Sequence, residues 1–213
     1  MPILPYAILA AVLAYFMGAI PFAYIVARMR SVNIFEVGSG NMGTTNVIRA
    51  VGPVLGITVL LLDMLKGIAA ILLARLIMPT TPNSATVIAA IFVILGHNWS
   101  IFAYMVTGKL RGGKGAATAF GTFLIISPPL LTVVMLATGI TILVRTRYMS
   151  LAVLVMTFIA SGSLVVLGLI PDNAQNQAHM IYALTLGGMI FYRHRENIKR
   201  LLAGNERRVG ERA

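Results

Sequence analysis

Residues 116–144 read AATAFGTFLIISPPLLTVVMLATGITILV, an apolar run with Ser127, Pro128 and Pro129 at its middle. Two adjacent prolines remove two helix hydrogen-bond donors and force the preceding residues out of helical geometry. The run therefore predicts two short helices that form a hairpin around Pro128-Pro129. At a rise of about 1.5 Å per residue, each helix would span only about 20 Å of an apolar layer about 30 Å thick.

Five other apolar runs lie at about 3–27, 53–78, 84–106, 150–170 and 178–192. Lys and Arg mark the cytoplasmic loops of membrane proteins. If every run crossed the membrane once, the basic loops 28–49 and 109–114 would face one side and the basic loop 145–147 the other.

Two crossings by residues 116–144 bring all three basic loops and the basic tail to the cytoplasm. The linkers near Pro79–Asn83 and Pro171–Gln177 then face outward. The charge pattern thus predicts seven transmembrane helices, with the N-terminus outside and the C-terminus in the cytoplasm.

The composition agrees with this interpretation. Of the 213 residues, 58% are hydrophobic and only 11% are charged, which is too apolar for a water-soluble domain. We therefore expect an all-α integral membrane protein of the cell (inner) membrane. Residues 1–213 should form a single membrane-embedded domain, because seven helices leave no room for a soluble one. The first apolar run has no charged residues before it, unlike a cleaved signal peptide.

The net charge of +11 does not indicate nucleic-acid binding. Seven of the 17 basic residues lie in the last 21 positions, and most others lie at the ends of apolar runs, as membrane topology requires. The chain has no cysteine, and its three histidines, at 97, 179 and 194, are scattered. We expect no metal ion and no cofactor.

The loop at 36–49 reads EVGSGNMGTTNVIR and is suited to binding an anion. Glycines allow the backbone to approach a ligand closely, and a helix that starts near Thr44 would add partial positive charge. Arg49 can pair with a phosphate through two hydrogen bonds. The residues expected to contact the anion, besides Arg49, are Gly38, Ser39, Gly40, Asn41, Gly43, Thr45 and Asn46. The alternative is a plain flexible loop.

The glycines of this loop also match G-x-G-x-x-G, with Asp63 placed 20 residues after Gly43. A dinucleotide fold would need a strand before the loop and a parallel sheet around it. No such strand is present, and Asp63 lies inside an apolar run. We therefore reject the dinucleotide interpretation.

A second glycine-rich loop, GKLRGGKG at 108–115, matches a nucleotide-binding pattern except at its end. Gly115 stands where Ser or Thr would hold magnesium, so nucleotide hydrolysis is not expected. Lys114, flanked by Gly112, Gly113 and Gly115 at the start of a membrane helix, still forms a suitable phosphate cradle. The alternative is that the basic residues of this loop only set the topology.

A third polar segment, YRHRENIKRLLAG at 192–204, places His194 and Asn197 three residues apart on one helical face. A basic segment next to a membrane can instead simply contact anionic lipid. Ser150 is expected on the same side of the membrane. Considered alone, its position is equally consistent with a helix cap.

Three further polar residues lie inside the apolar runs. Asp63 and Lys66 are spaced i,i+3 in a membrane helix, which favours a structural ion pair over a substrate contact. His97 either orients a glycine-rich loop or binds a buried carbonyl group.

Together these motifs resemble the bacterial acyl-phosphate:glycerol-3-phosphate acyltransferases, the PlsY family. The resemblance rests on G-S-G-N-x-G-x-T-N at 38–46 with Arg49, on Gly96-His97 with G-G-K-G at 112–115, and on H-R-E-N-I at 194–198 with Gly204 and Glu206. It covers the whole chain. The gap between His97 and Gly112 is longer than we expect for this family.

The resemblance implies an enzyme that transfers a fatty acyl group from acyl phosphate to the 1-hydroxyl of sn-glycerol 3-phosphate, giving lysophosphatidic acid and phosphate. Its partners would be these two substrates and membrane lipids. By motif position, the catalytic residues would be Ser39, Arg49, Lys114, His194 and Asn197, with Ser150 and the glycines of both loops binding substrate. Either His194 or a substrate phosphate could take the hydroxyl proton, and we favour the phosphate.

Two other functions are weighed against this one. A transporter of organic phosphates would usually show paired repeats and polar sites at the membrane midplane. Here no repeat is visible and the polar residues are predicted on one side. The other glycerol-phosphate acyltransferase chemistry uses H-x-x-x-x-D, but Phe102, Leu184 and Lys199 occupy the position of that aspartate after the three histidines.

Overall fold

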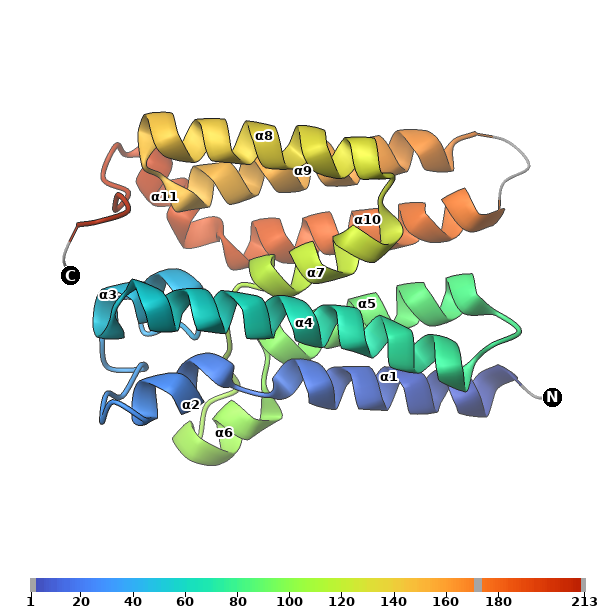
Figure 1. The fold of residues 1–213 in the computed structure, drawn as a ribbon, viewed down its shortest axis with the longest axis horizontal. Helices are drawn as coiled ribbons and strands as arrows, with labels where there is room; N and C mark the ends of the chain where they lie inside the picture. The colour runs from blue at the N-terminus through green and yellow to red at the C-terminus, as the bar shows by residue number, and fades with distance from the viewer. Residues whose placement is uncertain (1–2, 171–173, 212–213) are drawn as a thin grey trace. The chain divides into compact units, whose positions relative to one another are not determined.

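The computed structural model describes residues 3–170 and 174–211, and its regular structure is helical apart from one isolated bridge between Ser100 and Arg111 (Figure 1). The all-α prediction is thereby confirmed for the described residues. The chain forms two compact units, unit 1 up to Thr122 and unit 2 from Phe123 to Glu211. A single functional domain stays a prediction.

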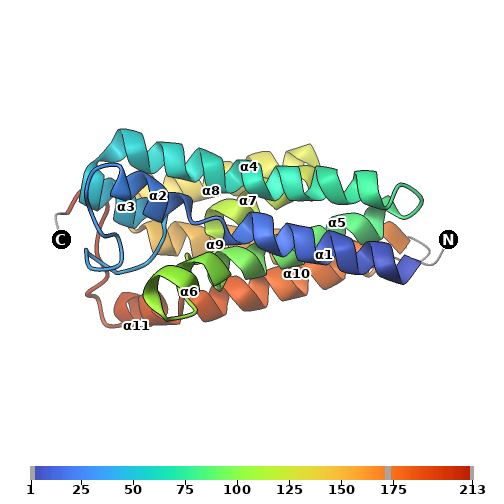
Figure 2. The same ribbon diagram turned by 90° about the horizontal axis from the view of Figure 1, so that it is seen from below.

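Unit 1 is built around three long helices that lie side by side (Figures 1 and 2), α4 running opposite to α1 and α5. Its helices are α1 (Ile3–Ala19), α2 (Phe22–Arg28), α3 (Thr44–Val51), α4 (Pro53–Ile77), α5 (Pro82–Asn98), α6 (Ile101–Thr107) and the first part of α7 (Ala116–Ile126). Pro53 and Pro82 begin their helices at the first helical position, where a backbone N–H would have no partner within the helix. The close approach of α1 to α5 requires Gly18 and Gly96, since a Cβ at either would overlap a backbone carbonyl of the other helix.

The first predicted run, 3–27, is interrupted between α1 and α2 at Pro21. A break in an apolar helix leaves carbonyl groups that need donors. Ser100 Oγ donates to the Ala19 carbonyl at 2.5 Å, and Lys66 Nζ donates to the Ile20 carbonyl at 3.1 Å. Polar side chains of two other segments thus satisfy the break.

The predicted run 84–106 also divides, into α5 and α6. Ser100 caps α6 by accepting a hydrogen bond from the Ala103 amide, and Gly108, with φ +68°, ends it. The bridge between Ser100 and Arg111 then returns the chain to the end of α5. The long gap between His97 and Gly112 is therefore taken up by α6, and it does not separate the two motifs in space.

Unit 2 places α9 against both α8 and α10, with α9 antiparallel to them (Figure 1). Its helices are the rest of α7, α8 (Pro129–Thr146), α9 (Met149–Gly168), α10 (Ala174–Arg193) and α11 (Arg195–Leu202). The outward linker predicted near Pro171–Gln177 begins on residues 171–173, which lie outside the described part of the chain.

The proline break at residues 127–128 is present, because α7 ends at Ile126 and α8 begins at Pro129. It divides the run unequally: α7 has 11 residues, whereas α8 has 18 and spans about 27 Å. Only α7 is therefore as short as expected, and the hairpin stays a prediction.

Within the described residues, four segments are long and apolar enough to cross a membrane: Ile3–Arg28, Pro53–Ile77, Pro129–Thr146 and Met149–Gly168. The remaining predicted crossings correspond to α5, α7 and α10. The total of seven crossings and their orientation stay predictions.

Candidate active site

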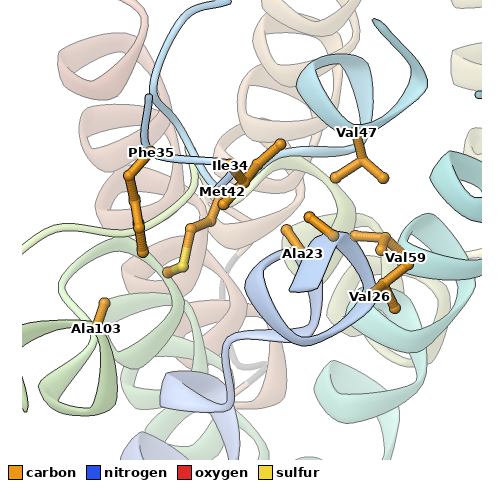
Figure 3. Close-up of a cluster of buried hydrophobic side chains, with 9 residues drawn as sticks. Ala23, Val26, Ile34, Phe35, Met42, Val47, Val59 and Ala103 are labelled. Atoms are coloured by element: carbon orange, nitrogen blue, oxygen red, sulfur yellow. The ribbon is translucent and has the colours of Figure 1, made fainter. Parts of the chain in front are cut away.

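The loop between α2 and α3 is anchored by buried apolar side chains at both of its ends (Figure 3). Ile34, Phe35, Met42 and Val47 pack with residues of three helices, namely Ala23 and Val26 of α2, Val59 of α4 and Ala103 of α6. Burial of these side chains fixes the loop on unit 1. The polar residues between Phe35 and Met42 are thereby held against the helices.

Asn46 organises the polar part of this loop from the first turn of α3. Its Oδ1 accepts a hydrogen bond from the Ser39 amide at 3.0 Å, and its Nδ2 lies within 3.0 to 3.1 Å of the carbonyl oxygens of Ile34, Val37 and Asn41. The side chain is 2% exposed. Asn46, predicted as a substrate contact, therefore directs its carboxamide into the loop and shapes it.

The other predicted residues of this loop lie around that framework. Gly38 and Gly40 have φ near +60°, a region in which only glycine is unstrained, so the backbone turns tightly on both sides of the exposed Ser39. The helix predicted near Thr44 begins at that residue, and Arg49 lies half-buried in its last turn. Asn41, Gly43 and Thr45 are partly exposed.

The second glycine-rich loop meets the first within unit 1. The Arg111 guanidinium lies over the Phe35 ring, 3.9 Å from its centroid. Gly113 has no space for a side chain, because a Cβ there would overlap His97 Nε2 and lie 2.6 Å from the Met42 carbonyl oxygen. Lys114 follows, partly exposed, two residues before α7. Two of the three predicted loops are thus brought together.

A buried polar cluster lies beside this loop. Lys66 Nζ is 2.8 Å from Asp63 Oδ1, so the predicted ion pair is confirmed. His97 Nδ1 is 3.6 Å from the same oxygen, and the Gly113 amide donates to the His97 carbonyl at 3.1 Å. His97 therefore contacts both the buried carboxylate and the 112–115 loop.

In unit 2, Glu206 joins two helices, α9 and α11, through three side chains. One carboxylate oxygen accepts hydrogen bonds from Ser150 Oγ of α9 at 2.9 Å and from Asn197 Nδ2 of α11 at 2.6 Å. The other accepts one from Arg200 Nε at 2.7 Å. Two predicted site residues, Ser150 and Asn197, are therefore brought together by a third residue.

Glu206 was quoted among the motif residues but given no role at the sequence level. The one signal for it is an acidic side chain inside a strongly basic tail. Burial alone would raise the pKa of this carboxyl group, but the hydrogen bonds from Asn197, Arg200 and Ser150 outweigh burial and leave the pKa below its usual value. Glu206 is thus a carboxylate at neutral pH and can accept all three hydrogen bonds.

His194 lies between α10 and α11, at the N-cap of α11, and is buried. Its Nδ1 is 2.9 Å from the Ile190 carbonyl oxygen. A carbonyl can only accept, so Nδ1 carries the proton and Nε2 carries the lone pair of the neutral ring. Asn197 lies three residues further on, in α11, whereas His194 precedes that helix, so a shared helical face stays a prediction.

Among the described residues, no group of three or more His, Cys, Asp or Glu side chains is placed to hold a metal ion. Absence of a metal and of a cofactor from the reaction stays a prediction.

Long apolar helices together with two joined, glycine-rich and basic loops define a multi-pass membrane protein with a phosphate-suited site. A family model described as "Glycerol-3-phosphate acyltransferase" matches residues 8–204. The chain belongs to this family, which confirms the resemblance seen in its motifs.

Individual relatives agree with this assignment. The glycerol-3-phosphate acyltransferase of Thermoanaerobacter pseudethanolicus is 41% identical over 207 residues, covering 97% of each chain. A crystal structure of PlsY, an integral membrane glycerol 3-phosphate acyltransferase, in its glycerol 3-phosphate form is 36% identical with a TM-score of 0.82, covering 96% of both chains. The lysophosphatidic acid form of PlsY is 35% identical with a TM-score of 0.80, covering 95% of this chain and 94% of that one.

Substitution by serine should have different effects on stability in the two glycine-rich loops. Gly113→Ser should lower the free energy of unfolding by about 1–3 kcal/mol, because its Cβ would overlap His97. Gly43→Ser should change it by less than about 0.5 kcal/mol, since a Cβ there meets nothing within 4 Å and serine is a favourable N-cap for α3. Thermal unfolding of both purified variants in the same detergent measures the difference. Equal stabilities would contradict the close contact at Gly113.

Proposed function

We propose that this glycerol-3-phosphate acyltransferase takes its acyl group from acyl phosphate. The 1-hydroxyl oxygen of sn-glycerol 3-phosphate attacks the acyl carbon, and the bond from that carbon to the phosphate oxygen breaks. Inorganic phosphate leaves with the electron pair, and the hydroxyl proton passes to a phosphate oxygen. The products are lysophosphatidic acid and phosphate.

The observation that carries this proposal is the meeting of the two glycine-rich loops in unit 1. Each loop leads into a helix N-terminus, that of α3 or α7. Lys114 lies in the second loop, and Arg49 lies in the last turn of α3, which follows the first loop. Both substrates of the proposed reaction carry a phosphate. Two cationic, amide-rich loops suit two such groups, because an oriented donor stabilises charge most strongly where water is partly excluded.

Acyl phosphate is a mixed anhydride with a good leaving group, so the reaction needs no covalent acyl-enzyme. Positioning of the substrates and neutralisation of their charge can supply the catalysis. A substrate phosphate, with a second pKa of about 6, can accept the hydroxyl proton itself. We therefore favour substrate-assisted proton transfer over His194 as the base.

The polar cluster of unit 2 serves the same reaction in this proposal. His194 and Asn197 bind substrate oxygens, Ser150 assists, and Glu206 fixes Asn197 and Ser150 through the hydrogen bonds described above. Ser39, Arg49 and Lys114 act in unit 1. The remaining substrate-binding residues are the backbone and side chains at Gly38, Gly40, Asn41, Gly43, Thr45, Gly112, Gly113 and Gly115, while Asn46 shapes the first loop.

The location follows from the charge pattern. We propose that the site faces the cytoplasmic leaflet of the cell membrane, where the basic loops are expected. An acyl chain can remain in the bilayer there while the phosphates stay in water.

The donor is tested by offering the purified protein glycerol 3-phosphate with palmitoyl phosphate, palmitoyl-CoA or palmitoyl acyl carrier protein. Only palmitoyl phosphate should be consumed, with equal amounts of lysophosphatidic acid and phosphate formed. Comparable turnover with either thioester would refute the proposed donor while leaving the acyltransferase assignment intact.

A further inference from the structure

The Asp63, Lys66 and His97 cluster lies inside unit 1 and none of its members has a role in the proposed reaction. Their exposed fractions are 2%, 6% and 5%. Ionised groups are costly to bury in a membrane helix and are retained there mainly where they do something specific. One part of that role is clear, since Lys66 satisfies the Ile20 carbonyl at the helix break.

The other part involves the carboxylate. Asp63 Oδ1 is shared between Lys66 Nζ at 2.8 Å and His97 Nδ1 at 3.6 Å. At 3.6 Å the second contact is electrostatic rather than a short hydrogen bond. It still fixes which ring nitrogen faces α4, and therefore directs the opposite edge, with Nε2, toward the 112–115 loop.

That edge lies where a Gly113 side chain would be, and the Gly113 amide is bonded to the His97 carbonyl. Gly112 also lies tightly against the His97 backbone. Gly112 and Gly113, the two residues before Lys114, thus contact both the backbone and the ring of His97. Glycines offer no side chains of their own to fix a conformation, so the surface beneath them must supply it.

We propose that Asp63 and His97 are positioning residues for the reaction: Asp63 orients the His97 ring, and His97 supports Gly113 through that ring and Gly112 through its backbone, so that Lys114 meets a substrate phosphate. This inference rests on the proposed role of Lys114. Asp63 thereby acts on catalysis through the His97 imidazole and Gly113.

The test uses three variants of the full-length protein. Asp63→Asn with Lys66→Met removes both buried charges together, which avoids the unpaired lysine that Asp63→Asn alone would leave. Lys66→Arg changes the same position but keeps a cation beside the Asp63 carboxylate, and it serves as the matched control. His97→Asn keeps a donor near Asp63 but has no atom in place of Nε2.

The neutral pair and His97→Asn should each lower kcat/KM by about 10- to 100-fold, with Lys66→Arg within about threefold of wild type. In a Lys114→Ala background the same changes should cost less than about threefold, because residues that act through one another are not additive. Glycerol 3-phosphate binding, measured by calorimetry without any donor, should weaken in parallel.

Full losses in the Lys114→Ala background would overturn the inference, as would equal losses in Lys66→Arg and the neutral pair. A fall in thermal stability with unchanged kcat/KM and unchanged binding would show a merely structural cluster and would also overturn it. If the wild-type protein uses another acyl donor, the activities of the variants and of the wild type are compared with that donor. Failure of the proposed donor is thereby distinguished from failure of this inference.

Discussion

Lys114→Ala and Arg49→Ala should each lose about 2–4 kcal/mol of transition-state stabilisation, or about 30- to 1000-fold in kcat/KM. Each side chain is proposed to neutralise phosphate in a partly buried site, where an ionic hydrogen bond is stronger than in water. The measurement is steady-state turnover of acyl phosphate and glycerol 3-phosphate at several concentrations of each.

Lys109→Ala is the matched control, because Lys109 belongs to the same basic loop but is exposed at the end of α6. It should remain within about threefold of wild type. A variant of Lys114 or Arg49 with activity as high as that of the control would remove that residue from the site.

The helical fold could be predicted because apolar runs of about 20 residues have few alternatives in a membrane. The breaks inside those runs were harder. The pair Pro128-Pro129 predicted one break, but the single proline at Pro21 did not predict the other. At that second break, Ser100 and Lys66 donate hydrogen bonds to the carbonyl groups of Ala19 and Ile20, which lie 81 and 46 residues away in sequence. No local pattern connects such distant residues.

The same reasoning explains which parts of the site were predictable. Glycine spacing and basic residues identify a phosphate loop from sequence, because the chemistry is carried by consecutive backbone groups. The hydrogen bonds by which Asn46 shapes its loop, and the three hydrogen bonds to Glu206, depend on contacts between separate segments of the chain. The sequence alone therefore did not predict them. His97 presented two alternatives, and the structure shows that it faces the glycine-rich loop and the buried ion pair together.

The second large effect is expected at His194, where the mechanism is least constrained by geometry. With Nδ1 bonded to the Ile190 carbonyl, Nε2 is the ring atom that can accept a proton or bind glycerol 3-phosphate. If His194 were the base, His194→Gln would abolish the chemical step. The wild-type pH profile would then show an acidic limb from protonation of the imidazole, and the variant would lack it.

We expect the other outcome: His194→Gln should mainly raise KM for glycerol 3-phosphate, by at least about tenfold, and should keep an acidic limb set by the substrate phosphate. The physical reason is that acyl phosphate needs little help from a base, whereas the glycerol phosphate must be held close to it. His179→Gln is the control, since His179 is also buried on α10 and lies about 22 Å away along the helix axis. A His194→Gln variant that binds glycerol 3-phosphate normally, yet turns over at least about a thousandfold more slowly at saturating substrate, would establish His194 as the base and disprove substrate-assisted transfer.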